Sequence, residues 1–555
     1  MVPFNLMPEG FTLPCTIMSV FHTISSLCIV AGFGSITWGA TSFNELTTSI
    51  DSYHVYAKTT NKAKEQIAVP YVVLISEKSA KDPEWKKVAD ALAKKHEGKI
   101  ITFKDNVYEA LPTLKKDLPR FLALVGSPEE ISRPLVTDLH RMTRQFDEDP
   151  YGDCIWGIVT GYSPGQAMRI VNQSEPLIIK RAAGTTNINA KRFDDSMVIT
   201  DWQPFQYLEQ HGATEPKIEF YKESLKEDAE AKGKSMGITP KLVEFWEKYQ
   251  PELMVTSSHA TQFNLEMPFG KGIIVSYDKK FYMLNMEQFK EFRTFLSGVI
   301  FNGKEDDLKK FLERIKAPTI KPNDKPAVWL APGNCLIGDA KNSPNSMVIT
   351  ALGDYGFNQL VGYTVPSWYG EGGWGTLRLF FDNHDQSSLA EAWYLNNQFL
   401  LEWTQREYPK LMDVHFNSPD IHSASRNPEF GRKIAEAKYG NNKDTIGLVH
   451  DRDTVAFYGD PAWVAKLDES HTKSPWTIRW DDKQNPEKGF TIIANEDSKN
   501  RFAVWYPKKI KAKMAILSVG DTMIPVSEAG ALTNDFLLIR ELDLKKGQEA
   551  KVTFQ

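Results

Sequence analysis

The sequence has little cysteine and no excess of basic residues, and each shortage excludes a class of protein. Four cysteines among 555 residues are too few for a disulfide scaffold, and no Cys-x-x-Cys or clustered His/Cys pattern predicts a zinc site. A net charge of −5 gives no basic surplus that would attract nucleic acid or anionic lipid. We therefore expect protein or peptide partners and no nucleic acid, while the sequence sets no oligomeric state.

Charged residues are also missing near the N-terminus. Residues 12–40 contain no Lys, Arg, Asp or Glu, and small residues follow at 39–42. This pattern is typical of a secretory signal, so residues 1–45 predict an exported protein that is secreted, periplasmic or on the cell surface. Two alternatives stay open. In the first, the segment is a retained membrane anchor, since about 20 apolar residues span a bilayer. In the second, the start codon is wrongly chosen. We expect the membrane to be a partner only if the segment is retained.

Beyond this segment, apolar runs alternate with amphipathic helical patterns. The runs at 67–76, 99–103 and 121–125 are separated by helical patterns at 82–96 and 107–116. This alternation is typical of a doubly wound parallel sheet flanked by helices. We predict two α/β subdomains, at 66–180 and at 181–467, with a helical insertion near 205–248 in the second.

The pattern of apolar and polar residues changes again near the C-terminus. Short alternating runs at 476–480, 489–494, 501–506 and 536–540 lack helical spacing. Such runs predict a small all-β sandwich over residues 470–555.

Cys335 stands out because of its position. The apolar run 327–331 enters a Pro-Gly-Asn turn that holds this cysteine. It therefore follows the carboxyl end of a buried strand, which is where ligands and catalytic groups gather in open α/β sheets. The alternative is a small buried thiol that fills a loop, since free cysteine is among the most buried residue types.

His259 occupies the matching position after the short apolar run 253–257. Cys335 comes 76 positions after His259 (335 − 259), which is enough for a crossover, so the two strands can be parallel neighbours. An imidazole beside a thiol stabilises the thiolate and later protonates a leaving amine. A carboxylate usually orients such a histidine, and Asp153 is the best placed. Cys154, next to it, is expected to lie in the core.

These motifs occur in the order found in a known family. The chain resembles the gingipain family of cysteine peptidases, which belongs to the caspase-like clan, from about Ile67 to its end. The resemblance rests on Ser257-Ser258-His259, Gly333-Asn-Cys-Leu-Ile-Gly338, Asp153-Cys-Ile-Trp-Gly157, Ser163-Pro-Gly165, Ser367-Trp368 and Tyr458-Gly-Asp-Pro461.

The resemblance implies a caspase-like catalytic subdomain, an immunoglobulin-like module at 470–555, and a cysteine-type endopeptidase. It implies Cys335 as nucleophile, His259 as general base and acid, and Asp153 as the orienting acid. The family usually has glycine after the histidine, whereas this chain has Ala260, whose N–H and that of Cys335 would form the oxyanion hole.

Substrate specificity is not carried over in full. Gingipains cleave after Arg or Lys with an acidic pocket residue, and the stretch 162–168 contains no carboxylate. We expect Trp368, Tyr369 and Trp374, in a glycine-rich loop, to line an apolar substrate pocket instead; the alternative is that they are ordinary aromatic residues of a surface loop. No cofactor is expected to be required, and the resemblance permits a structural calcium ion without locating it. The alternative function is a catalytically inactive, peptidase-like surface or binding protein.

Overall fold

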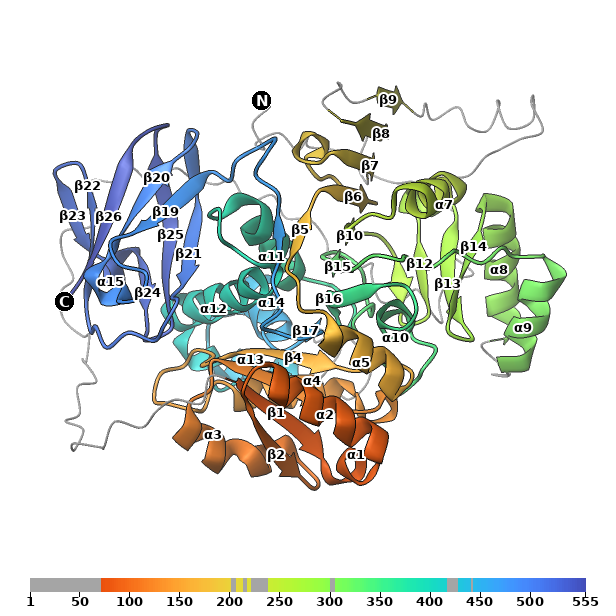
Figure 1. Ribbon diagram of the computed structural model, residues 1–555, viewed down its shortest axis with the longest axis horizontal. Helices are drawn as coiled ribbons and strands as arrows, with labels where there is room; N and C mark the ends of the chain where they lie inside the picture. The colour runs from red at the N-terminus through yellow and green to blue at the C-terminus, as the bar shows by residue number, and fades with distance from the viewer. Residues whose placement is uncertain are drawn as a thin grey trace. The chain divides into compact units, whose positions relative to one another are not determined.

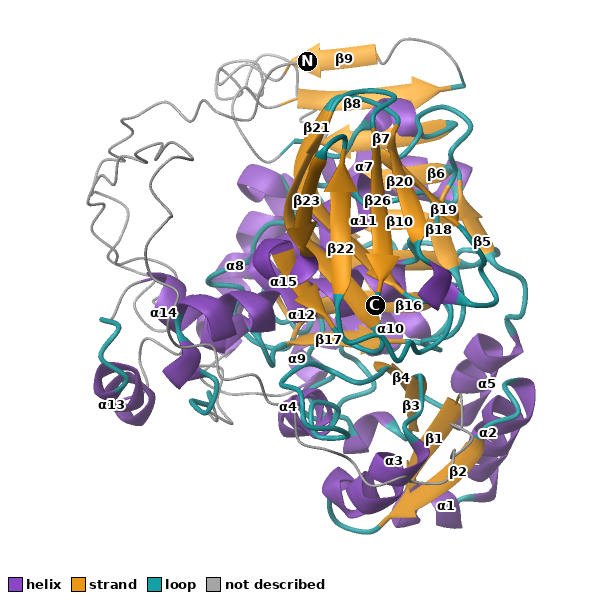
Figure 2. Ribbon diagram, turned by 90° about the vertical axis from the view of Figure 1, so that its left-hand side faces the viewer, coloured by secondary structure: helices purple, strands orange, loops and turns teal. Residues whose placement is uncertain are grey.

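One twelve-stranded sheet runs through a mixed α/β fold (Figures 1 and 2). The computed structural model describes residues 71–200, 206–212, 217–220, 238–299, 305–416, 428–440 and 443–555; the predicted export segment at 1–45 lies outside them. In spatial order the strands are β2 (Lys99–Phe103), β1 (Tyr71–Ser76), β3 (Phe121–Val125), β4 (Ile155–Val159), β17 (Val455–Tyr458), β16 (Phe357–Tyr363), β15 (Ala327–Ala331), β10 (Leu253–Val255), β6 (Arg181–Gly184), β7 (Asp195–Ile199), β8 (Gln206–His211) and β9 (Lys217–Phe220). The predicted α/β class is confirmed.

The central strands form where the sequence is continuously apolar. Every residue of β1 (YVVLIS) and of β15 (AVWLA) is buried. Parallel strands covered by helices on both faces need such runs, because neither face meets water. This explains why the strand before Cys335 begins and ends where the sequence predicts.

The sheet reverses direction in its middle. Strands β15 and β16 are parallel, β16 and β17 are antiparallel, and β17 joins β4 in parallel through the single pair Tyr458 and Ile158. The carboxyl ends of β10, β15 and β16 therefore lie at the same edge as the amino ends of β17 and β4. The carboxyl ends of β1, β2 and β3 lie at the opposite edge.

Helices cover the sheet and carry typical caps. Helix α2 starts with Asp82 as N-cap and Pro83 in the first turn, and α12 has a capping box of Ser388 and Glu391. None of the helices in the described ranges is long and apolar enough to cross a bilayer. The α-helices are α1 (Glu77–Lys81), α2 (Pro83–Lys95), α3 (Leu111–Asp117), α4 (Arg133–Met142), α5 (Pro164–Asn172), α7 (Ile238–Tyr249), α8 (Met286–Val299), α9 (Glu305–Arg314), α10 (Met347–Leu352), α11 (Glu371–Asp382), α12 (Leu389–Glu407), α13 (Pro428–Glu436), α14 (Lys443–Asp451) and α15 (Val526–Ala529).

The predicted helical insertion at 205–248 is only partly helical. Its described residues include β8 and β9, which extend the edge of the sheet, followed by α7. The prediction of helix was wrong for β8 and β9, because the segments QYLEQH and KIEF pair as antiparallel strands next to β7.

A small antiparallel sheet follows β10 and holds the chain after His259. Its strands are β11 (Ala260–Thr261), β12 (Asn264–Glu266), β13 (Ile273–Tyr277) and β14 (Lys280–Leu284). Apolar residues of β13, β14, α8 and α9 form a separate small core beside it.

The C-terminal module consists of two antiparallel sheets that share one apolar core, drawn in blue in Figure 1. It is tied to the α/β region by buried contacts: Asn383 Nδ2 donates to Ala503 O at 2.8 Å, and Arg540 pairs with Glu402 at 2.9 Å. The all-β architecture agrees with the sequence prediction, whereas its immunoglobulin-like kinship stays a prediction. One sheet is β19 (Trp476–Trp480), β20 (Phe490–Ala494), β26 (Glu549–Phe554), β22 (Ala515–Val519) and β23 (Thr522–Pro525); the other is β21 (Ser498–Trp505), β25 (Phe536–Leu544) and β24 (Gly530–Leu532).

Candidate active site

The loops that carry His259 and Cys335 leave neighbouring strands at the same edge of the sheet. Strands β10 and β15 are parallel, and Val255 pairs with Leu330. His259 lies four residues after Val255, and Cys335 lies five residues after Leu330. The two strands are therefore neighbours, as predicted.

Asn334 joins these two loops. It is fully buried, its Oδ1 accepts from Thr256 Oγ1 at 2.5 Å, and its Nδ2 donates to Ser258 O at 2.9 Å. The residue before the cysteine is thus bonded to the residue before the histidine. A buried amide whose donor and acceptor are both used fixes the loops against each other.

Both loops hold a non-glycine residue at positive φ beside the candidate catalytic residue. Ser258, before His259, has φ +145°, and Leu336, after Cys335, has φ +61°. Such conformations cost about 1–3 kcal/mol each and cluster at functional sites, where the surrounding structure imposes them. The hydroxyl of Ser258 donates to Glu266 O, which helps to hold this conformation.

The Cys335 thiol is partly exposed and receives a backbone donor. The N–H of Ser367 donates to Sγ at 3.3 Å, and Ser367 Oγ lies 3.6 Å from Sγ while it donates to Gly333 O at 2.8 Å. An amide directed at sulfur stabilises a thiolate. Cys154 differs, because it is buried and burial raises the pKa of its thiol well above the usual value.

His259 is exposed, and the carboxylate near it is that of Glu266 on β12. The Glu266 N–H donates to His259 O at 2.9 Å. Burial raises the pKa of the Glu266 carboxyl, and the positive charges of Arg293, 3.2 Å away, and of His259 oppose that rise. Sequence reasoning missed this acid; the available signal was a short hairpin directly after the histidine that returns a carboxylate to it.

Asp153 does not reach His259. It precedes β4, which is separated from β10 by β17, β16 and β15, so at about 4.8 Å per strand the two lie about 19 Å apart. Its carboxylate instead accepts from the Phe146 N–H at 2.9 Å. The prediction that Asp153 orients the histidine is corrected for this reason: three strands, β17, β16 and β15, lie between the strand that follows Asp153 and the strand that precedes His259.

Asp153 belongs to an acidic group with Asp147 and Asp149, whose carboxylate oxygens lie within 4.8 Å of one another. Burial, and then the charge of Asp147, raise the pKa of Asp149 to about 7, and burial raises that of Asp153. Among the described residues this is the group that could hold a metal ion, and carboxylate oxygens suit calcium.

The three predicted aromatic residues lie in different settings. Trp374 is on the first turn of α11 and not in a glycine-rich loop; its ring lies against Gly333, where a Cβ would be 3.0 Å from it. Tyr369 donates to Asp444 Oδ1 at 3.0 Å, and Trp368 packs edge-on against His450 at 6.2 Å. Of the three, Trp374 has a described contact with the cysteine loop.

Glycine lets α11 approach that loop. A Cβ on Gly373 would lie 2.2 Å from Pro332 O, so only glycine fits at this contact. Of the two predicted oxyanion donors, Ala260 is buried at the start of β11, and Cys335 is partly buried in the loop after β15.

The chain leaving Cys335 turns back along β16. The N–H of Leu336 donates to Val365 O at 3.1 Å and that of Gly338 to Tyr363 O at 2.9 Å. Farther on, Asn342 Nδ2 donates to Glu129 O at 2.7 Å, beyond the carboxyl end of β3. This segment therefore crosses the sheet from one edge to the other.

No family model and no curated protein matches the chain. One solved structure described as "Structure of Protease" aligns with 89% of this chain and 98% of its own, at 9% identity and a TM-score of 0.35. A likeness this weak assigns neither a family nor a residue role.

Proposed function

We propose that the protein is an exported cysteine endopeptidase of the gingipain-like type. The observation that carries the proposal is the pair of neighbouring strand-end loops that hold Cys335 and His259, joined by Asn334. It is supported by the partly exposed thiol and by the Ser367 amide directed at its sulfur. Protein or peptide chains are the proposed substrates.

In the proposed reaction His259 accepts the Cys335 proton, and the thiolate attacks the scissile carbonyl carbon. The N–H groups of Ala260 and Cys335 bind the oxyanion. The C–N bond then breaks, and His259 gives its proton to the leaving amine. Water hydrolyses the resulting thioester and restores the thiol. Glu266 takes the orienting role that the sequence assigned to Asp153.

Substrate binding is proposed at the aromatic residues beside this loop. Trp374, which packs on Gly333, is the best placed to contact a substrate side chain, and Trp368 follows directly after Ser367. The reaction requires no cofactor. Asp147, Asp149 and Asp153 would hold a structural calcium ion away from the thiol.

The thiol itself provides the test. Iodoacetamide at neutral pH, followed by peptide mapping, should modify Cys335 and spare Cys154, which serves as the internal control. Cys335→Ala should abolish hydrolysis of a broad peptide library without changing the thermal midpoint by more than a few degrees. Equal labelling of both thiols would contradict an activated nucleophile.

The second candidate is an inactive, peptidase-like binding protein. The replacement of the family's glycine by Ala260, which is only 9% exposed, favours it. In that case the wild-type protein and Cys335→Ala would leave the peptide library equally intact and retain the same peptides on a column.

A further inference from the structure

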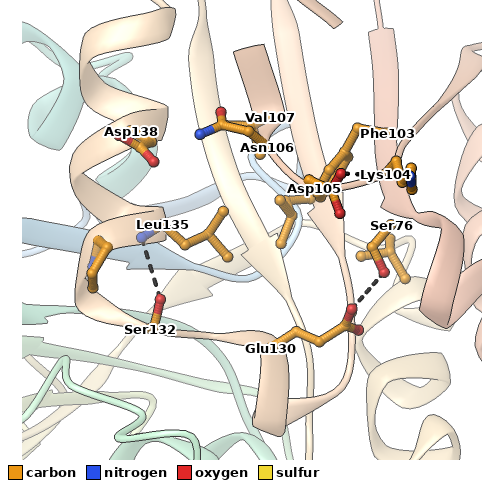
Figure 3. A pocket seen from close by; sticks show the side chains of 14 residues that line it. Ser76, Phe103, Lys104, Asp105, Asn106, Val107, Glu130, Ser132, Leu135 and Asp138 are labelled. Atoms are coloured by element: carbon orange, nitrogen blue, oxygen red, sulfur yellow. Dashed lines mark hydrogen bonds and ion pairs between the residues drawn. The ribbon is translucent and has the colours of Figure 1, made fainter. Parts of the chain in front are cut away.

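A cavity of about 330 Å³ lies at the opposite edge of the sheet from Cys335. Its walls include the last residues of three neighbouring strands: Ser76 of β1, Phe103 of β2 and Val125 of β3 (Figure 3). Strand β1 has β2 on one side and β3 on the other, so the chain reverses its direction of winding there. In doubly wound sheets such a switch point opens a crevice that binds ligands.

Two of its walls are fixed by hydrogen bonds. Glu109 accepts the N–H groups of Lys104, Asp105 and Asn106 at 2.8, 2.9 and 3.2 Å, and so holds the loop after β2. The Glu130 carboxylate accepts the hydroxyls of Ser76 and Ser79. The cavity is therefore formed without a ligand, which lowers the entropic cost of binding.

Negative charge dominates the lining. Three carboxylates, of Asp105, Glu130 and Asp138, face one ammonium group, that of Lys104, which lies 3.8 Å from Asp105. Figure 3 shows Asp138 and Asp105 on opposite sides of the cavity. In the described part of the chain no lysine, arginine or histidine forms an ion pair with Glu130 or Asp138. Burial raises the pKa of the Asp138 carboxyl, and the positive charge of Arg141 opposes that rise without cancelling it.

The spacing of these carboxylates argues against a single metal ion. Among the described residues only Asp147, Asp149 and Asp153 bring three ligand atoms within 4.8 Å. The N-terminus of α4 also faces the cavity and would attract an anion, but it carries about half a charge and its N-cap Ser132 already accepts from Leu135 N–H. The full negative charges of the three carboxylates outweigh this partial positive charge of the helix N-terminus.

We propose that this cavity binds a small organic cation with alkylammonium groups, either a free diamine or the lysine side chain of a short peptide. The volume is at the small end of the range for ligand pockets, about 300–1,000 Å³. The site is independent of whether Cys335 cleaves peptides.

Calorimetric titration of the full chain tests the proposal, with 1,4-diaminobutane, the tripeptide Lys-Gly-Lys, 1,4-butanediol and inorganic phosphate as separate probes. We expect one of the two amines to bind, to weaken as salt rises, and to lose about tenfold in affinity in Asp138→Asn and in Glu130→Gln. The diol should not bind. Asp90→Asn, an exposed change on α2 outside the cavity, is the matched control and should bind as the wild type does.

The amine that binds more tightly identifies the source of the ligand. Thermal unfolding of each variant separates a local effect from misfolding, and Asp138→Asn alone decides the outcome if Glu130→Gln unfolds, since the latter weakens the contacts to Ser76 and Ser79. Binding of phosphate in place of both amines overturns the proposal. So does amine binding that Asp138→Asn leaves unchanged, or no amine binding at all.

Discussion

The side-chain amide of Asn334 donates to the backbone carbonyl of Ser258, so one hydrogen bond of 2.9 Å joins the loop of the candidate nucleophile to the loop of its base. Neither residue takes part in the proposed chemistry. Their contact nevertheless decides whether two loops from different strands meet.

Asn334→Ala should therefore affect both stability and activity. Loss of both bonds of a buried amide leaves Thr256 Oγ1 and Ser258 O without this partner, at about 1–3 kcal/mol for each group left unsatisfied. The free energy of unfolding and kcat should both fall. Asn323→Ala is the control: Asn323 is also buried and accepts from Trp246 Nε1 at 2.7 Å, so it should lower stability while kcat stays within twofold.

Gly373→Ala should displace the loop before Cys335. Its methyl group would lie 2.2 Å from Pro332 O, and a backbone atom cannot yield as a side chain can. We expect a loss of more than about 2 kcal/mol of stability together with a large loss of peptide hydrolysis. Gly431→Ala in α13 meets nothing within 4 Å and should stabilise the protein by about 0.5–1 kcal/mol. Equal effects of the two substitutions would contradict the packing argument.

Glu266→Gln should change the pH dependence of hydrolysis more than it changes stability. Burial raises the pKa of the Glu266 carboxyl, and glutamine removes this ionisation, so the acidic limb of the kcat/KM profile should move to lower pH and the maximum should fall. Glu247→Gln, which removes an ionic contact to Lys321, is the control. A profile that keeps its position in Glu266→Gln would remove Glu266 from the site.

Asp149→Asn should stabilise the protein at alkaline pH and not at acid pH. The pKa of Asp149 is about 7 in the folded chain and about 3.9 in an unfolded one. The folded state thus holds the proton more tightly, and wild-type stability falls as pH rises from about 4 to about 7, by up to about 4 kcal/mol. Asp149→Asn removes the ionisable group, and with it this loss of stability at higher pH. Thermal unfolding in EDTA at pH 4.5 and pH 8 checks the sign, with Asp90→Asn as control; a gain that is equal at both pH values would contradict it.

The sequence could predict the strands whose residues are all apolar, because burial on both faces leaves a direct mark. Strand β16, which begins at Phe357, lacks this mark in its first half. Asn358 and Gln359 interrupt the apolar pattern in that half. Both are buried polar residues, and the Gln359 amide donates to Asp460 O and Trp463 O at 3.1 and 2.8 Å. Those partners lie about a hundred residues away, so no local pattern contains them.

In the candidate site, too, features that depend on local sequence could be predicted, and features that depend on distant strands could not. The positions of His259 and Cys335 after short apolar runs were readable, because each depends only on its own strand. The place of Asp153 depends on which strands lie between β4 and β10, and that order is set by β17, which comes almost at the end of the α/β region. Glycines at 370–375 suggested a loop, yet most of them belong to α11, where they allow close packing: Gly372 lies against Val455, Gly373 against Pro332 and Gly375 against Asn396.

The segment that crosses the sheet has a thermodynamic consequence. Asn342 lies only seven positions after Cys335 (342 − 335), and it is hydrogen-bonded to Glu129, the neighbour of Glu130 in the cavity wall. If an amine at Glu130 alters the affinity of a reversible inhibitor for the thiol, linkage requires that the inhibitor alter the affinity for the amine by the same factor. The two titrations, each run with and without the other ligand, close one cycle, and the size of that shared factor measures how strongly the two edges of the sheet are coupled.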